Sequence, residues 1–323
     1  MTSAESAFIQ LLRPIAADPG ARALLDDAAV LKIGERKLVV TKDMIVEGVH
    51  YRSDDPAADV AWKLVAVNLS DLAGKGARPL AALLGYTLRE EDWDRAFAEG
   101  LKLALASFGL PLIGGDTVSA PPGTPRTLSL TAMGEAQDRV PSRAGAKAGD
   151  LLWVTGSLGD AGAGLRILEG KLEGDAALVR RYRAPRPRLE AGQALAPGVS
   201  AMMDVSDGLL IDAKRMAAAS EIGIEIDLDE LPLSEAFLAA MGDGRDARLF
   251  AATAGDDYEL LFATSAEGAP DILQLAEQLG LPLSRIGRCV EGAGLVIRDR
   301  GEELPLPEKL GFEHDPQARR SGS

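Results

Sequence analysis

Aspartates recur in this sequence at the ends of short apolar runs, beside Ser, Thr or Gly. They are Asp26, Asp27, Asp43, Asp71, Asp116, Asp204, Asp207, Asp256 and Asp257. A single aspartate in such a place is an ordinary turn or helix-capping residue. Several carboxylates that meet at one place would instead offer the oxygen ligands that Mg²⁺ prefers, which it often shares with substrate phosphates. The pattern leaves two interpretations open, structural caps or a magnesium centre for phosphoryl transfer.

Asp71 favours the second interpretation. The spacing of Val60, Leu64, Val67 and Asp71 predicts a helix over 56–73 with all four residues on one face. We expect a carboxylate on the apolar face to point into the protein. Burial of a carboxylate alone is costly, so Asp71 needs a cation or strong hydrogen bonds, and a purely structural aspartate satisfied by hydrogen bonds stays possible.

Composition and charge exclude several classes of protein. The 323 residues include 35 Lys and Arg against 49 Asp and Glu, a net charge of −14. The hydrophobic content of 46% is enough for a core and excludes a disordered acidic chain. The acidic balance argues against nucleic acid as a partner, because a phosphate backbone attracts basic surfaces. It also means that a polyphosphate would bind only with metal ions that neutralise both sides.

The single cysteine, the two histidines and the length of the apolar runs narrow the class of protein and its compartment further. The single cysteine, Cys289, cannot form an internal disulfide, which fits a reducing compartment. The two histidines, His50 and His314, are too few for a zinc site built from His. No apolar run reaches the length of a membrane span, and the first residues lack a basic signal-peptide region. We therefore expect a cytoplasmic protein without a membrane partner.

The expected elements indicate a mixed α/β or α+β fold. Strands are predicted over 24–33, 37–51, 77–88, 110–119 and 124–136, the fourth ending in a glycine turn, and a second amphipathic helix over 90–109. Pro, Gly and charged residues cluster at 138–150, which predicts a boundary between domains 1–137 and 138–323. Strand–turn–helix units are predicted in the second domain, one of them capped by Ser206 or Asp207. The first 25 residues should form short helical turns, and the last ten should be disordered.

Familiar nucleotide motifs are absent. The sequence has no P-loop and no H-R-D catalytic loop. The glycines at 159, 162 and 164 lack the third glycine of a Rossmann fingerprint, so they indicate either close strand–helix packing or a phosphate-binding turn. Arg143 could clamp a phosphate or lie solvated in the connector. No Ser/His/Asp or Cys/His constellation can be assembled, so no catalytic nucleophile is predicted.

Nine segments follow one another along nearly the whole chain. They are DDAAV (26–30), TKDMIVEGVHY (41–51), NLSDLAGKGARP (68–79), LIGGDT (112–117), SRAGAKAGD (142–150), VTGSLGDAGAG (154–164), VSDGLLID (205–212), GDDYELLF (255–262) and GFEH (311–314). In this order they resemble the thiamine-monophosphate kinase family, which belongs to the superfamily of aminoimidazole ribonucleotide synthetase and selenophosphate synthetase. VEGVH, NLSDLA and DDYELLF together point to the thiamine branch.

The resemblance implies a reaction and a fold. The reaction is Mg²⁺-dependent, in-line transfer of the ATP γ-phosphate to thiamine monophosphate, which gives thiamine diphosphate and ADP without a phospho-enzyme. Several Mg²⁺ ions are expected, with ATP as co-substrate. The implied fold is the two-domain aminoimidazole-ribonucleotide-synthetase-like fold. Its N-terminal half forms a β-barrel across a homodimer, its C-terminal half is α/β, and ATP lies between the halves.

The resemblance also implies site residues. The metal positions are Asp27, Thr41, Lys42, Asp43, Asp71, Asp116, Asp204 and Asp207. The ATP contacts are Gly115, Asp116, Arg143 and Ser206. The thiamine-phosphate contacts are His50, Asp256 and Phe312, of which Phe312 could instead be an ordinary core residue. An aromatic ring suits the flat cationic thiazolium through stacking and cation–π attraction.

Three positions depart from the family pattern. Leu25 stands where Gly usually precedes the acidic pair, which affects the local turn. Lys42 stands where Thr is common, so a metal contact there would use the backbone carbonyl, or the lysine would touch phosphate. Asp256 stands where Glu is usual and is one methylene shorter, so its contact with the substrate is expected through water.

Three alternatives remain. A superfamily relative would use ATP on another small acceptor, although selenophosphate enzymes typically carry a reactive Cys or selenocysteine near the N-terminus, and this chain has none there. A non-catalytic sensor would bind ATP and metal without turnover. A purely structural acidic protein would not be stabilised by Mg²⁺ and ATP, whereas a ligand at about 100 times its Kd adds roughly 2.7 kcal/mol.

Overall fold

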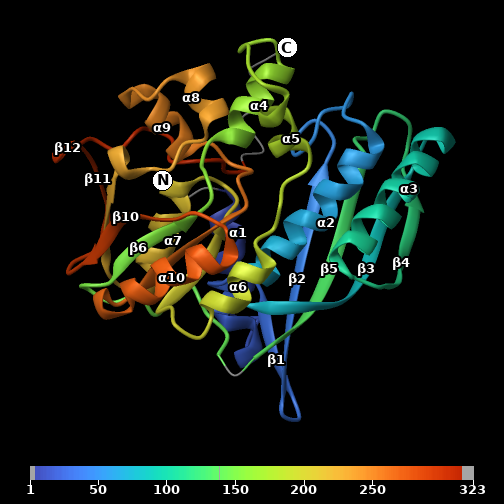
Figure 1. Cartoon of the computed structure of the whole chain (residues 1–323). Helices are drawn as coiled ribbons and strands as arrows, with labels where there is room; N and C mark the ends of the chain where they lie inside the picture. The colour runs from blue at the N-terminus through green and yellow to red at the C-terminus, as the bar shows by residue number, and fades with distance from the viewer. Residues whose placement is uncertain (1–3, 138, 315–323) are drawn as a thin grey trace.

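The chain forms two β-sheets with helices packed between and around them (Figure 1). This computed structural model describes residues 4–137 and 139–314. The first sheet has five strands from the N-terminal half, and the second has seven strands from the C-terminal half. The mixed α/β prediction is confirmed. None of the described helices is both long and apolar enough to cross a bilayer.

The N-terminal sheet is open, and helices cover one of its faces. Its strands, in spatial order, are β1 (Ala29–Ile33), β2 (Arg36–Val46), β5 (Thr127–Ala136), β3 (Ala77–Leu88) and β4 (Leu112–Ser119). β3 and β4 run parallel and the other neighbours antiparallel. Along β2, Val39, Thr41 and Ile45 are buried, whereas Lys42 and Met44 are exposed, as alternation along a strand requires. The strands described do not close into a barrel within one chain.

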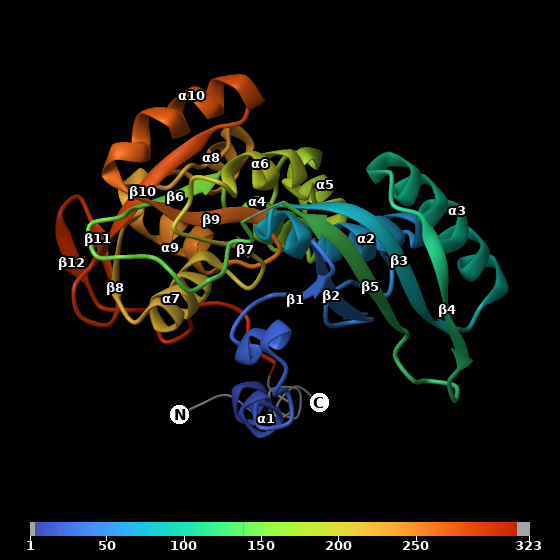
Figure 2. The same cartoon turned by 90° about the horizontal axis from the view of Figure 1, so that it is seen from below.

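Helix α2 (Ala57–Gly74) lies between the two sheets and contacts elements of both halves (Figure 2). It packs on β2, β3 and β5 on one side and on β7 and α6 on the other, while α3 (Glu91–Phe108) flanks it. The predicted helix is confirmed, but a single apolar stripe was too narrow a description. Lys63, Asn68 and Ser70 are also buried, because protein surrounds the helix on nearly every side.

The C-terminal sheet is mixed. Its strands, in spatial order, are β12 (Glu302–Leu304), β11 (Gly294–Asp299), β8 (Gly223–Asp227), β10 (Leu283–Val290), β6 (Leu151–Thr155), β9 (Glu259–Thr264) and β7 (Ala201–Val205). β8 and β11 pair in parallel, and the other neighbours pair antiparallel. The remaining helical segments are α1 (Ala4–Leu12), η1 (Pro19–Leu24), α4 (Asp160–Leu168), α5 (Ala176–Arg183), α6 (Leu189–Leu195), α7 (Leu209–Ser220), η2 (Leu228–Glu230), α8 (Glu235–Met241), α9 (Arg245–Thr253), η3 (Ala266–Gly268) and α10 (Ala269–Leu279).

The structure corrects the expected glycine turn and the expected helix cap, and it favours one of the two interpretations of the glycine run at 159–164. Gly115 lies inside β4 rather than in a turn, and glycine is needed there because a Cβ would lie 2.0 Å from the Leu84 backbone oxygen of β3. Neither Ser206 nor Asp207 caps α7 by its side chain; Asp212 instead accepts both of their backbone N–H groups, at 3.1 Å each. A Cβ at Gly164 would lie 2.1 Å from the Leu178 carbonyl oxygen, which supports the packing interpretation of that glycine run. The predicted C-terminal disorder falls mainly on 315–323, outside the described residues.

Candidate active site

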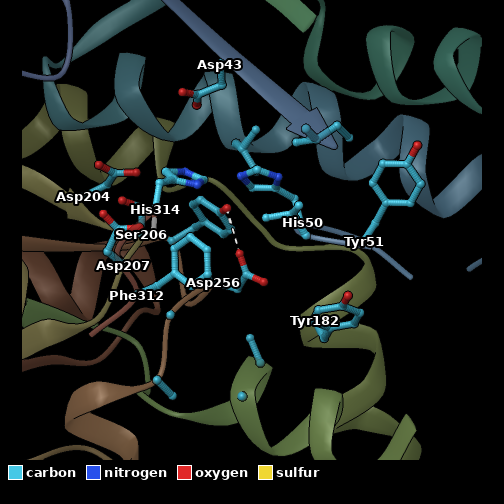
Figure 3. A pocket seen from close by; sticks show the side chains of 18 of the residues that line it. Asp43, His50, Tyr51, Tyr182, Asp204, Ser206, Asp207, Asp256, Phe312 and His314 are labelled. Atoms are coloured by element: carbon cyan, nitrogen blue, oxygen red, sulfur yellow. Dashed lines mark hydrogen bonds between the residues drawn. The ribbon is translucent and has the colours of Figure 1, made fainter. Parts of the chain in front are cut away.

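One cavity of about 930 Å³ lies between the two halves and is lined by both. Figure 3 shows Asp204 and Asp207 at one end and Tyr51 and Tyr182 at the other, with Phe312 between them. We call the first region the acidic end and the second the aromatic end. Each end contains residues that the sequence motifs singled out.

Three carboxylates meet at the acidic end. Asp27 precedes β1, Asp71 comes from the last turn of α2, and Asp204 comes from β7. One carboxylate oxygen of each lies within 4.8 Å of the other two. Neighbouring hydroxyls orient two of these carboxylates, because Thr41 on β2 donates a hydrogen bond to Asp71 and Ser70 donates one of 2.6 Å to Asp204.

The acidic end holds more carboxyl groups than the nearby protein cations can keep ionised. Burial, followed by the charges of Asp43 and Asp204, raises the pKa of Asp71 well above its ordinary value. Burial and the charge of Asp27 raise the pKa of Asp204 to about 8. Burial and the same neighbour raise the pKa of Asp43 to about 6. Such a group of buried carboxylates fits a divalent cation, and its all-oxygen donors suit Mg²⁺ in particular.

Protein cations surround Asp26 and Asp27 on the opposite side of this group. The Lys75 ammonium, directly after α2, bonds both carboxylates, at 2.7 Å to Asp27. Arg143, from the connector between the sheets, also bonds Asp27. Burial alone would raise the pKa of Asp27, but the charges of Arg143 and Lys75 outweigh it and hold the pKa well below its ordinary value. Burial would likewise lower the pKa of Lys75, but the two aspartates raise it, so the ammonium stays charged.

The loop after β7 completes the acidic end. Asp207 bonds Arg215 of α7, and Arg215 also bonds Asp212 at 2.8 Å. Asp212 holds the backbone of Ser206, as described above, which fixes the turn of the VSDG motif. Sequence reasoning named Asp207 and Ser206 but missed Arg215, whose side chain lines the cavity beside them.

His50 and Phe312 meet near the middle of the cavity. His50 Nδ1 accepts the Val46 N–H at 3.1 Å, so a neutral ring carries its proton on Nε2. Burial, followed by the charge of His314, lowers the pKa of His50 to about 4. The His50 ring lies 6.4 Å from that of Phe312 and 5.2 Å from that of His314. Phe312 is 42% exposed, which excludes the core-anchor interpretation, and its backbone N–H donates to the Asp207 carbonyl at 2.9 Å.

Asp256 is held by a buried lysine. It adopts a left-handed backbone conformation, with φ of 69°, in the turn before β9. Lys63 of α2 donates to its carboxylate at 2.8 Å and to the His50 carbonyl at 2.9 Å, and its ammonium lies 4.0 Å from the centre of the Tyr182 ring. The Tyr258 hydroxyl donates a further bond of 3.0 Å to Asp256. Sequence reasoning missed Lys63, although a lysine within an apolar helix was a usable signal.

Three predicted site residues lie elsewhere. Lys42 is opposite Thr131, and Thr131 is opposite Leu83, so Lys42 projects from the face of the sheet that α2 does not cover. Its ammonium donates to Ser129 at 3.2 Å. Gly115 and Asp116 lie on the exposed edge strand β4 and do not line the cavity. Within one chain, Gly115 and the side chains of Lys42 and Asp116 do not join the acidic end, and the predicted roles of these residues stay predictions.

Comparison with known proteins first defines the class. Residues 25–136 match the family model described as "AIR synthase related protein, N-terminal domain". Residues 147–300 match "AIR synthase related protein, C-terminal domain". The fold and the cavity are therefore those of a two-domain AIR synthase-related protein.

Individual relatives then define the family. A thiamine-monophosphate kinase of Caulobacter vibrioides is 40% identical over 94% of this chain and 89% of its own. The crystal structure of the thiamine-monophosphate kinase from Stenotrophomonas maltophilia K279a has a TM-score of 0.76 at 38% identity, covering 94% of this chain and 99% of its own. A structure titled "AaThiL complexed with AMPPCP and TMP" has a TM-score of 0.82 at 29% identity, covering 96% and 97%. The chain belongs to the thiamine-monophosphate kinase family, which confirms the resemblance.

Proposed function

We propose that the chain transfers the γ-phosphoryl group of ATP to the phosphate of thiamine monophosphate, giving thiamine diphosphate and ADP. The observation that carries the proposal is a single cavity that joins an oxygen-rich acidic end to an aromatic end. The relatives named thiamine-monophosphate kinase support it, as does the solved relative whose title names AMPPCP and TMP. A reaction that consumes ATP is expected in the cytoplasm.

The acidic end would hold several Mg²⁺ ions. Asp27, Asp71 and Asp204 would supply the central ligands, with Asp43, Asp207 and the Thr41 hydroxyl around them. When bound, the metal would neutralise the phosphates and stabilise the charge on the transferring group. Lys42 would contribute only through its backbone carbonyl, because its side chain projects from the opposite face of β2.

The ATP phosphates would bind beside Arg143 and Ser206. Arg143 lines the cavity next to Asp27, and Ser206 lines it in the turn before α7. A guanidinium suits phosphate oxygens because it donates two parallel hydrogen bonds. The assignment of Gly115 and Asp116 to ATP rests on the family motif alone.

The thiamine moiety would bind in the middle of the cavity, on the side toward the aromatic end. Phe312 offers a ring face to the cationic thiazolium or the pyrimidine, and His50 offers a neutral Nε2–H donor. Asp256 offers a carboxylate that Lys63 already holds in place. No strong general base is needed, because the accepting oxygen belongs to a phosphate that is already ionised. The chain's task is to bring two anions together in line, and no side chain need become phosphorylated.

We also propose a homodimer, in which the N-terminal sheets of two copies form the barrel. The sheet face without helices carries exposed apolar side chains, among them Leu31, Ile33, Met44 and Leu83. Edge strand β4 is exposed along its whole length. An apolar, uncovered sheet face with a free edge fits burial against a second copy. Because each sheet belongs to one half, we keep 1–137 and 138–323 as the proposed domains.

A turnover assay tests the function. Purified protein is incubated with ATP, Mg²⁺ and thiamine monophosphate, and the thiamine species are separated by chromatography, with EDTA as the metal-free control. We expect equal amounts of thiamine diphosphate and ADP, only when Mg²⁺ is present. Unphosphorylated thiamine in place of the monophosphate should give no product. ATP binding without any product would reject the kinase in favour of a sensor.

A further inference from the structure

Lys75 is a charged side chain with no access to solvent, and it lies inside the acidic end. Its exposed fraction is 0%, and it follows the last residue of α2 between Gly74 and Gly76. Both glycines lie in close packing, which is tight at Gly74 and leaves no room for a side chain at Gly76. A Cβ at Gly74 would lie 3.2 Å from the Asp204 backbone nitrogen, and one at Gly76 would lie 2.4 Å from the Ala196 Cβ. The end of α2 is thus pressed against β7 and α6, which places Lys75 in the centre of the molecule.

The ammonium of Lys75 has a complete set of partners. It donates to the carboxylates of Asp26 and Asp27 and, at 3.5 Å, to the Met202 carbonyl. An ammonium has three N–H donors, so each has an acceptor. The Asp26 and Asp27 side chains are only 1% and 4% exposed, so water solvates their charges poorly and the protein cations must compensate them. Lys75 has no access to the cavity surface and cannot bind a substrate phosphate itself.

The acidic end therefore has two unequal sides that share Asp27. On one side, Asp26 and Asp27 are paired with Lys75, and Arg22 and Arg143 each bond one of them. On the other side, the described residues give Asp71 and Asp204 hydroxyl donors but no ion pair. Only the second side lacks positive charge when no metal is bound.

We propose that Lys75 is a built-in counter-cation of the metal centre. It takes one cation position permanently, holds Asp26 and Asp27 in place without metal, and weakens divalent binding at the adjoining carboxylates. The inference rests on the proposed metal site, but it concerns metal binding rather than turnover. A unit positive charge one hydrogen bond from a metal ligand repels a divalent ion strongly, because the site excludes water. Removal of that charge should therefore tighten metal binding.

The test is Lys75→Met, which removes the charge and keeps an unbranched side chain of similar length. Mn²⁺ alone is titrated into EDTA-treated, dialysed protein, and free Mn²⁺ is followed by its EPR signal. We expect the variant to bind Mn²⁺ about tenfold more tightly, or to bind one more ion, because the repulsion is gone. We also expect it to melt at a lower temperature without metal and to regain stability when Mn²⁺ is added.

Lys63→Met is the matched control. Lys63 is a second buried lysine and lies within α2, with an exposed fraction of 1%, but its ammonium bonds Asp256 on the far side of the cavity from Lys75. This variant should also lose stability, while its Mn²⁺ affinity stays within about twofold of the wild type, since the lost charge is remote from the acidic end. Tighter Mn²⁺ binding in both variants would show that general loosening, and not the charge of Lys75, is the cause.

Other outcomes decide the proposal as well. Unchanged or weaker Mn²⁺ binding by Lys75→Met would overturn it. A variant that folds only with Mn²⁺ would support it, because a metal ion then replaces the ammonium. If Lys75→Met folds under neither condition, Lys75→Gln keeps polar donors without charge and takes the same test. A wild-type protein that binds Mn²⁺ but lacks turnover would refute the proposed function and leave this inference standing.

Discussion

The Thr41 hydroxyl on β2 donates a hydrogen bond to the Asp71 carboxylate on α2, although thirty residues separate them in the sequence. The bond joins the N-terminal sheet to the central helix at the acidic end. It also fixes the direction of a carboxylate that lies in the last turn of α2 and lines the cavity. This bond thus links the sheet and the helix directly through the candidate metal ligand.

Asp71→Asn should abolish most turnover without loss of the fold. Asparagine has nearly the same shape and still accepts the Thr41 hydrogen bond, but it removes one metal-binding charge. Substitution of a residue that only hydrogen-bonds a metal ligand typically costs about 10–100-fold in affinity or activity, so loss of a ligand itself should lower kcat by about 100-fold or more. The metal-free variant should be at least as stable as the wild type, because asparagine is neutral at every pH, whereas burial and the neighbouring aspartates disfavour ionisation of Asp71. Kinetics and thermal denaturation measure the two effects.

Asp246→Asn is the control for that substitution. Asp246 is exposed on α9 and does not line the cavity, so the same chemical change there should leave turnover unaltered. Near-normal turnover in well-folded Asp71→Asn would contradict the proposed ligand role.

Phe312→Ala should weaken the binding of thiamine monophosphate selectively. The ring lies near His50 and is 42% exposed, so it is available to a ligand. Loss of a stacking and cation–π contact of 1–2 kcal/mol should raise KM for thiamine monophosphate about tenfold. KM for ATP should change less than about twofold, since the acidic end is untouched. Initial-rate kinetics with each substrate varied in turn measures both constants.

Leu306→Ala is the matched control for Phe312. Its side chain is also 42% exposed in the C-terminal segment, but it does not line the cavity. It should change neither KM. An equal rise of both KM values in Phe312→Ala would indicate that the ring orders the segment rather than contacts the thiamine.

The regular elements were predictable because their signals are local. The strand expected over 77–88 coincides with β3, and the helix expected over 90–109 contains α3. Period-two and helical spacing are read within one segment, whatever surrounds it. Most of the cavity-lining residues that lie within the family motifs were also predicted, because each motif is a short continuous segment that can be recognised without knowledge of the fold. Asp71 was the clearest case, since a carboxylate on an apolar helix face signals burial by itself.

The buried lysines were not predictable in the same way. Lys63 and Lys75 have buried ammonium groups because α2 is enclosed by a second set of elements, β7, α6 and the turn before β9. That enclosure depends on contacts more than a hundred residues away in the sequence. Lys42 and Asp43 are consecutive residues of β2, so alternation along the strand predicts that their side chains point to opposite faces of the sheet. The prediction from the motif nevertheless assigned both residues to one metal site.

The stability of the metal-free protein should fall as pH rises from about 6.5 to about 9. The pKa of Asp204 is raised to about 8 in the folded protein, mainly by burial, from an ordinary value of 3.8. The folded state therefore holds a proton that the unfolded state has lost. This contribution to stability is complete below the ordinary pKa and is lost as pH rises through 8. Asp71, whose pKa is also raised, adds to the same trend.

Mg²⁺ should reverse that trend, because it binds the ionised carboxylates in competition with protons. The gain in melting temperature on addition of Mg²⁺ should be larger at about pH 9 than at about pH 6.5. His50 has only a small opposing effect at the lower pH, because its pKa is lowered to about 4 in the folded protein while an unfolded histidine loses its proton near the ordinary value of 6.5. Asp204→Asn should flatten the metal-free pH dependence. A wild-type melting temperature that stays constant over this range without metal would disprove the raised pKa.

Ile113→Asp should convert the proposed dimer into monomers. Ile113 lies on edge strand β4 and is 62% exposed in the single chain, so the substitution should leave the fold of each chain intact. In a dimer built on the N-terminal sheets, a buried aspartate at this edge would cost several kcal/mol. Multi-angle light scattering should give twice the chain mass for the wild type and the chain mass for the variant. Leu273→Asp, at a 55% exposed position on α10 in the other half, should remain dimeric. A wild type that is monomeric at micromolar concentration would show that the uncovered face of the N-terminal sheet serves some other contact.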